Sequence, residues 1–295
     1  VEGRGYRVKG YLNEKVELAP GDRMEGSFRL RLTAEGGKSQ PTYHRSDGIF
    51  LLAYQQDAIE VTPAQTVPWQ CLPGLWHGKL TKILDSFLPE DAAAFVKALL
   101  LGDRSELSYS TKTDFKIAGI SHIVAVSGLH VSVLFALVQL LTRRKRFLTA
   151  LVGIPAVLAF AALVGFTPSI TRAAIMQILM MVATCLDREA DPLTSLSAAC
   201  LCMLAVNPLV IESVSFQLSV SCVLGIFLFA SPMYQWLIDT KRLGRWTGKN
   251  LRGKLVHYIA TGTSVSLSAS LFTVPLTALY FGTVSLIGVV GNLLI

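Results

Sequence analysis

The sequence predicts a multi-domain α+β protein, in which a small antiparallel β domain precedes amphipathic helices and a polytopic α-helical membrane domain. Hydrophobic residues make up 52% of the chain and charged residues only 16%, with a mean hydropathy of +0.49. Soluble domains carry about a quarter charged residues, so this chain cannot cover itself with polar surface. Strand-like alternation is confined to the residues before Thr62, and nearly continuous apolar runs begin at His122.

Residues 1–70 are predicted to form the β domain. A strand with one buried face alternates apolar and polar side chains, and four segments fit that expectation: Tyr6–Leu12, Gly26–Leu32, Gly48–Tyr54 and Ala58–Thr62. The sequence Pro20-Gly21-Asp22 is typical of a turn between the first two strands. Four or five short strands in about sixty residues favour a closed antiparallel barrel of the OB type.

Residues 71–119 change to a helical period. Leu80, Ile83 and Phe87 fall on one face of a predicted helix that starts near Leu75, and Lys79 and Lys82 lie opposite. Such an amphipathic helix, with Trp76 near its start, suits a membrane surface. Pro89 is expected to open a second helix, which Gly102 ends. Neither helix is long enough to span a bilayer.

Residues 120–295 form the predicted membrane domain. Its apolar runs lie near 122–142, 147–165, 172–186, 193–207, 214–238, 256–281 and 283 onward. The third and fourth runs are shorter than the about 20 residues that a full crossing needs, so we expect them to be tilted, re-entrant or irregular. The chain starts at Val1 and ends inside an apolar run, so we expect further sequence on both sides of it.

The distribution of charged residues between the loops predicts how these runs are oriented in the membrane. Acidic and basic residues balance in residues 1–118, so the whole net charge of +7 lies in residues 119–295. Basic residues follow the first, third and fifth runs, whereas Arg172 alone falls near the intervening loops. Lys and Arg gather in cytoplasmic loops, so the sequence predicts a multi-pass protein of the cell membrane with the β domain outside. Positive charge placed among apolar runs also excludes a generic basic nucleic-acid-binding domain.

Polar groups interrupt the apolar runs at several places. Ser127, Gly128 and His130 are predicted near the middle of the first helix, with Ser127 and His130 on one face. An ionisable group in hydrocarbon costs several kcal/mol unless it faces a partner or water, so this pair either lines a polar path or bonds a neighbouring helix. Arg172 either snorkels to the outer interface or presents a fixed positive charge to a polyanion.

Two further polar stretches follow. Gln217 and Ser219 come after Asn207-Pro208, and hydroxyl groups recur between Thr261 and Thr273. Small hydroxyls in membrane helices usually indicate close helix packing, although they also line wet paths. We favour packing for the stretch that ends at Thr273.

Five stretches of the chain together resemble the competence domain of the ComEC family. They are LLLGDRSEL (99–107), GISHIVAVSGLHVSV (119–133), GFTPSITRAAIM (165–176), DREADPLTSL (187–196) and NPLVIESVSFQLSV (207–220). The resemblance covers residues 97–281 in the expected order. It implies an inner-membrane channel through which single-stranded DNA enters during natural transformation, with an OB-like domain outside. It also implies partner proteins that deliver DNA outside and pull it inside.

If the chain conducts DNA, its candidate sites are polar groups of the apolar runs and basic groups of the strands. The DNA-path candidates are Ser127, His130, Arg172, Gln217 and Ser219, and the external DNA-contact candidates are Arg7, Lys9, Arg29 and Arg31. The stretch Tyr43–Asp47 departs from the family pattern. Many members also carry a nuclease domain with a His-x-His-x-Asp-His metal motif, which this sequence lacks. We therefore expect no catalysis, no metal and no cofactor in this chain.

Two other functions remain open from the sequence. A small-molecule permease is one, although residues 119–207 and 208–295 show no convincing repeat of the kind that transporters often carry. An intramembrane serine hydrolase built on Ser127 is the other. It needs a base within hydrogen-bond reach of the serine, and His130 on the same helix is poorly placed for that role.

Overall fold

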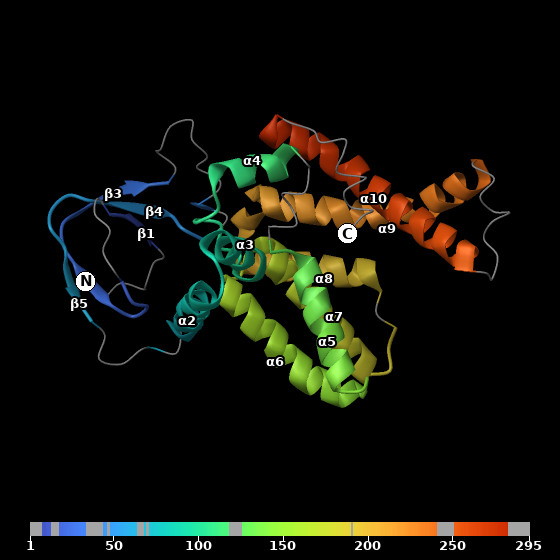
Figure 1. The fold of residues 1–295 in the computed structure, drawn as a ribbon, viewed down its shortest axis with the longest axis horizontal. Helices are drawn as coiled ribbons and strands as arrows, with labels where there is room; N and C mark the ends of the chain where they lie inside the picture. The colour runs from blue at the N-terminus through green and yellow to red at the C-terminus, as the bar shows by residue number, and fades with distance from the viewer. Residues whose placement is uncertain are drawn as a thin grey trace.

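The structure, a computed structural model, describes residues 8–12, 18–33, 44–45, 48–63, 68, 71–117, 126–189, 191–240 and 251–282. Two small β-sheets lie at one end of the molecule, shorter helices follow, and long apolar helices make up the rest (Figure 1). This order of elements is the one that the sequence predicts. Arg7, the basic loop at 241–250 and the apolar run from 283 lie outside the described residues.

The strands form at the predicted places but pair differently. β1 (Val8–Tyr11), β4 (Leu51–Gln55) and β3 (Phe28–Leu32) make one sheet in that order, with β1 parallel and β3 antiparallel to β4. β2 (Arg23–Glu25) and β5 (Glu60–Thr62) make a second, antiparallel sheet.

The expectation of a wholly antiparallel domain is therefore wrong for β1, and the described strands form two sheets, not one closed barrel. A parallel pair needs a crossover of a dozen or more residues, and the roughly 40 residues between β1 and β4 provide it. Alternation along a strand reports which side chains share a face, and it carries no information about the direction of the neighbouring strand.

The two helices predicted after the β domain are confirmed. α2 (Leu72–Phe87) has no buried residue, and Trp76, Ile83 and Phe87 expose apolar surface. This is what we expect of a helix that lies on a membrane surface. α3 (Glu90–Leu101) follows Pro89 and ends at Gly102, whose φ of +78° is readily adopted only by glycine. α4 (Tyr109–Ile117) comes next.

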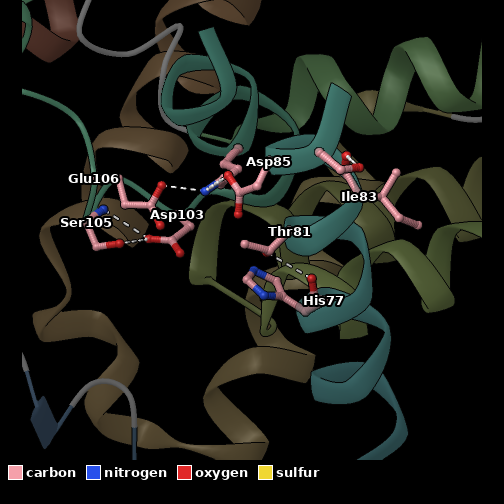
Figure 2. A network of polar contacts seen from close by, with 9 residues as sticks. His77, Thr81, Ile83, Asp85, Asp103, Ser105 and Glu106 are labelled. Carbon is pink, nitrogen blue, oxygen red and sulfur yellow. Dashed lines mark hydrogen bonds and ion pairs between the residues drawn. The ribbon is translucent and has the colours of Figure 1, made fainter. Parts of the chain in front are cut away.

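Ion pairs between the buried Lys97 and two half-exposed carboxylates connect α3 to its neighbours. The ammonium group of Lys97, whose residue is 1% exposed, pairs with Asp85 of α2 and with Glu106 of the loop before α4. Figure 2 shows the two carboxylates converging on it. Burial lowers the pKa of Lys97, but the two carboxylates outweigh burial and hold the pKa above its usual value. In the same loop, Asp103 accepts hydrogen bonds from the backbone N and the Oγ of Ser105.

The apolar runs form helices whose lengths differ from the predicted ones. α6 (Arg146–Val164), α7 (Pro168–Cys185), α9 (Val214–Thr240) and α10 (Leu251–Phe281) are long and apolar enough to cross a bilayer, whereas α5 (Gly128–Leu141) and α8 (Pro192–Val206) are shorter. A 3₁₀ turn, η2 (Pro208–Glu212), leads into α9. α8 is short, as predicted, but α7 is not, because Pro168 starts this helix one turn before the apolar run.

α5 begins later than the sequence predicts. Ser127 is its N-cap, with extended backbone angles, so Ser127 and His130 lie at the start of the helix and not near its middle. The backbone N of Ser127 donates to Nδ1 of His130 at 3.1 Å, which satisfies one of the amide groups that a helix start leaves free. The spacing of Ser127 and His130, three residues apart, therefore marks the start of a helix and not a polar face in its middle.

Glycines let the long helices approach one another. A methyl group at Gly153 of α6 would lie 2.7 Å from Sδ of Met181 on α7, and one at Gly225 of α9 would lie 2.5 Å from the backbone oxygen of Ser268 on α10. Ser264 and Ser268 are buried, and each hydroxyl donates to a carbonyl one turn earlier in α10. These contacts agree with the packing interpretation of the hydroxyl-rich stretch.

The bundle has two distinct ends. At one end, α5 turns into α6 through Arg143 and Arg144, both with positive φ (50° and 56°), and Arg146 pairs with Asp187 after α7. At the other end, a methyl group at Gly102 would touch Val126 and Val164, and Nδ2 of Asn207 donates to the carbonyl of Arg45. The β sheets and α3 therefore adjoin the end away from the basic turn (Figure 1).

Candidate functional site

A half-open cavity of about 260 Å³ lies between α5, α7 and the start of α8. Its lining consists of small, polar and methionine side chains, among them Gly128, Ser132, Arg172, Gln177, Met180 and Ser195. From Arg172 to Met180 the cavity follows α7 for about 12 Å, given a rise of 1.5 Å per residue. It therefore runs between the helices from the end near the β sheets towards the start of α8, and it opens to the surface at Ser132, Met180 and Pro192, which are exposed.

Among the described residues that line this cavity, Arg172 is the only basic one, and it is 8% exposed. Pro168 starts α7, which places Arg172 just over one turn inside the helix. Its Nη1 lies 3.5 Å from Sδ of Met176, and its Nη2 would lie 3.8 Å from a methyl group at Gly128. The absence of a side chain at Gly128 thus gives the guanidinium room at the start of α5.

The charge of Arg172 is unbalanced within the described residues. None of their ion pairs involves Arg172, and its Nε has no hydrogen-bond partner among them. A buried charge costs several kcal/mol unless it is paired or hydrogen-bonded. A snorkelling arginine would extend its guanidinium to the surface, so the burial of Arg172 argues against that alternative.

Gln177 is a second unsatisfied group in the same cavity, and sequence reasoning missed it. It is 8% exposed and its Nε2 has no partner among the described residues. An amide NH₂ is a donor, like the guanidinium, so both side chains offer hydrogen-bond donors to whatever enters. One signal in the sequence could have found it: Gln177 is a lone amide in the apolar run 172–186, and polar residues inside membrane segments are candidates for functional sites.

The other DNA-path candidates lie outside the cavity lining. His130 is half-buried and its Nδ1 accepts from the Ser127 backbone. Gln217 is hydrogen-bonded at both ends of its amide: its Nε2 donates to the carbonyl of Ile211, and its Oε1 accepts from the hydroxyl of Tyr280 at 2.7 Å. Gln217 thereby ties η2 and α9 to the end of α10, while Ser219 is half-buried on α9. Their assignment to a path stays a prediction.

The external candidates come together on the three-stranded sheet. The strand register places Lys9 opposite Leu52, Arg31 opposite Leu52 and Arg29 opposite Tyr54. Residues opposite one another share a face, so Lys9, Arg29 and Arg31 lie on the same side of the sheet. Arg7, the fourth candidate, lies outside the described residues.

Neither of the two membrane histidines that the structure describes is bonded to the hydroxyl of Ser127. Nδ1 of His130 accepts from the backbone N–H of Ser127, and Nδ1 of His257 lies 2.6 Å from the hydroxyl of Tyr234 at the far end of α9. A nucleophilic serine needs its base at hydrogen-bond distance and oriented by a third group. The described contacts give no support to the serine hydrolase alternative.

The fold and the cavity define a polytopic helical membrane protein with a buried positive charge between its helices. The chain belongs to the Competence protein family, whose model matches residues 99–295. A curated relative is "ComE operon protein 3" of Bacillus subtilis (strain 168), 29% identical over 216 residues, which cover 71% of this chain and 25% of the relative. The chain thus spans about a quarter of that relative's length. No solved structure matches it.

Proposed function

We propose that this chain forms part of a path for the uptake of single-stranded DNA across the cell (inner) membrane during natural transformation. The single observation that carries the proposal is the pair of unsatisfied donors, Arg172 and Gln177, in a cavity inside a bundle of the Competence family. A polyanion cannot enter hydrocarbon, so it needs a hydrated route with polar or positive groups along it.

The cavity suits a phosphodiester better than a neutral solute. Arg172 lies at the start of α5, where backbone N–H groups and the helix dipole also favour negative charge. A phosphate in contact with both would pair with the guanidinium of Arg172 and accept from the N–H groups at the start of α5. Gln177 would add a further donor along the cavity. A site for neutral permeants has no need of an unpaired buried cation, so the small-molecule permease is the weaker alternative.

The contribution of Arg172 is electrostatic in this proposal. No bond is made or broken in the path, and we propose that this chain is not itself an enzyme. The β sheets adjoin the end of the bundle away from Arg143–Arg146, and we infer from the positive-inside rule that they lie outside the cell. Lipids surround the long helices, and other competence proteins deliver DNA outside and pull it inside.

Substitution of Arg172 tests the proposal. Arg172→Ala should lower transformation frequency by an order of magnitude or more, because a desolvated contact between a cation and a phosphate is worth about 1.5–3 kcal/mol. Arg172→Lys should keep much of the activity, since a point charge still attracts phosphate. The matched control is Arg188→Ala, which removes an exposed positive charge at the other end of α7. Protein abundance in the membrane is measured for each variant, and unchanged transformation in Arg172→Ala cells would refute the proposal.

A further inference from the structure

One face of the three-stranded sheet combines aromatic rings with positive charge. The register pairs Tyr11 of β1 with Tyr54 of β4, and Tyr54 in turn with Arg29 of β3. Lys9 and Arg31 flank Leu52 on the same face. We call this surface the tyrosine face, formed by Lys9, Tyr11, Arg29, Arg31 and Tyr54.

The side chains of the tyrosine face form a continuous column. The rings of Tyr11 and Tyr54 stack with centroids 5.1 Å apart and an interplanar angle of 10°. The ammonium of Lys9 lies 5.6 Å from the Tyr11 centroid, and the guanidinium carbon of Arg31 lies 5.9 Å from the Tyr54 centroid. The order along the column is therefore cation, ring, ring, cation.

The tyrosines are accessible, which is unusual for stacked rings that only serve folding. Tyr11 is 39% exposed and Tyr54 is 37% exposed, whereas Ala53 on the opposite face of β4 is buried. Aromatic pairs that stabilise a fold gain most of their free energy by burying their area. The one residue of these strands that is buried, Ala53, lies on the other face, so the column is free for a ligand.

Charge on the tyrosine face is of one sign. The strands β1, β3 and β4 contain no acidic residue, although acidic and basic residues balance over residues 1–118 as a whole. The three cations are thus segregated onto this surface. The tyrosine face therefore complements a ligand that carries both negative charge and flat rings. Unpaired nucleotides offer both.

We propose that the tyrosine face binds single-stranded nucleic acid, with bases stacked on Tyr11 and Tyr54 and phosphates held by Lys9, Arg29 and Arg31. Surfaces that hold single strands combine aromatic platforms with basic grooves. An incoming base would displace a cation from the outer side of a ring, and the freed cation would pair with the adjoining phosphate. A duplex keeps its bases stacked internally, so it has no free base for the rings. The inference deepens the proposed uptake function and rests on it for its biological role.

The test is direct binding by the purified full chain in detergent micelles. The probe is a short fluorescent oligothymidylate, and its anisotropy gives the dissociation constant. Tyr11→Ala and Tyr54→Ala should each weaken binding about tenfold, since stacking of a base on an aromatic side chain is worth about 1–3 kcal/mol. Tyr54→Phe should bind like the unmodified chain, because it keeps the ring and loses only the hydroxyl. Tyr109→Ala is the matched control, since Tyr109 is 87% exposed on α4 and away from the sheet.

Two competitors identify what is recognised. Unlabelled oligothymidylate should displace the probe, whereas inorganic polyphosphate and duplex DNA of equal length should displace it at least tenfold less well. Equal competition by polyphosphate, or Tyr→Ala variants that bind like the control, would show a merely electrostatic surface and overturn the proposal. Circular dichroism of each variant excludes unfolding as the cause of a loss.

The outcome is separable from that of the uptake proposal. Arg172→Ala should leave oligothymidylate binding to the tyrosine face unchanged, because Arg172 lies in the cavity between α5, α7 and α8. Loss of transformation in Arg172→Ala cells without tyrosine-dependent binding would remove this inference and leave the uptake proposal standing. Tyrosine-dependent binding together with normal transformation of Arg172→Ala cells would refute the uptake proposal and leave the binding by the tyrosine face standing.

Discussion

Replacement of Gly225 by alanine should destabilise the helix pair α9–α10, and the protein should lose more stability than on the same change at Gly78 or Gly153. The new methyl group would lie 2.5 Å from the backbone oxygen of Ser268 and 3.2 Å from Cβ and Cδ2 of Phe272. A flexible side chain can rotate away from such a contact, but a helix carbonyl cannot. The two helices must therefore move apart.

The magnitude follows from two opposing effects. Overpacking a well-packed contact costs typically 1–3 kcal/mol, whereas alanine in place of glycine inside a helix gains about 0.5–1 kcal/mol. We expect a net loss of about 1–2 kcal/mol at Gly225. Gly153→Ala should be closer to neutral, because its 2.7 Å contact is with the flexible sulfur of Met181. Gly78→Ala on α2, with no atom within 4 Å, should be stabilising.

The assay is unfolding of the purified protein in micelles with increasing fractions of a denaturing detergent, followed by circular dichroism. The three variants should fall in the order Gly78→Ala, Gly153→Ala, Gly225→Ala from most to least stable. A Gly225→Ala variant as stable as Gly78→Ala would mean that α9 and α10 do not meet at this point, and the packing of the hydroxyl-rich stretch would have to be rejected.

Three further predictions concern other parts of the chain. In a version whose native cysteines are replaced by serine, Asp57→Cys should react with an impermeant thiol reagent in intact cells and Glu189→Cys should not; labelling of both from outside would refute the topology. Lys97→Met should lower the stability to detergent-induced unfolding, and this loss should be largest below pH 10.5, where the stabilising contribution of the charged Lys97 is fully present. The loss should shrink as pH rises through the raised pKa of Lys97. A loss of stability that does not change with pH would contradict the ion-pair account. A peptide of residues 72–87 should gain helicity by circular dichroism when anionic vesicles are added, because Trp76, Ile83 and Phe87 can then be buried in lipid; no gain would remove the membrane role of α2.

Local signals predicted the helix boundaries of the first half well. Pro89 and Gly102 bracket α3 as expected, because both residues act on their own backbone angles and need no partner. The start of α5 was misplaced for a related reason. A hydropathy window averages over some twenty residues, so it registers the apolar run from 122 and overlooks the cap at Ser127.

Properties that depend on distant residues were beyond the sequence. The direction of β1 relative to β4, and with it the contact between Tyr11 and Tyr54, depends on how the intervening chain returns. The basic alternation in β1 and β3 did predict the charged face. In the cavity, Arg172 was predicted from its charge alone, but Gln177 required the knowledge that α7 turns it inward.

The turn between α5 and α6 has a consequence for how the protein is inserted. Arg143 and Arg144 both adopt left-handed backbone angles, which cost about 1–2 kcal/mol per residue for side chains other than glycine. Glycine or asparagine would close the same turn with less strain, yet in the proposed topology either would remove a charge that keeps this loop on the cytoplasmic side. Replacement of both arginines by glycine should therefore yield a chain that is harder to unfold once correctly inserted, but that inserts in the wrong orientation more often. If the proposed topology holds, this turn exchanges thermodynamic stability for fidelity of insertion during biogenesis.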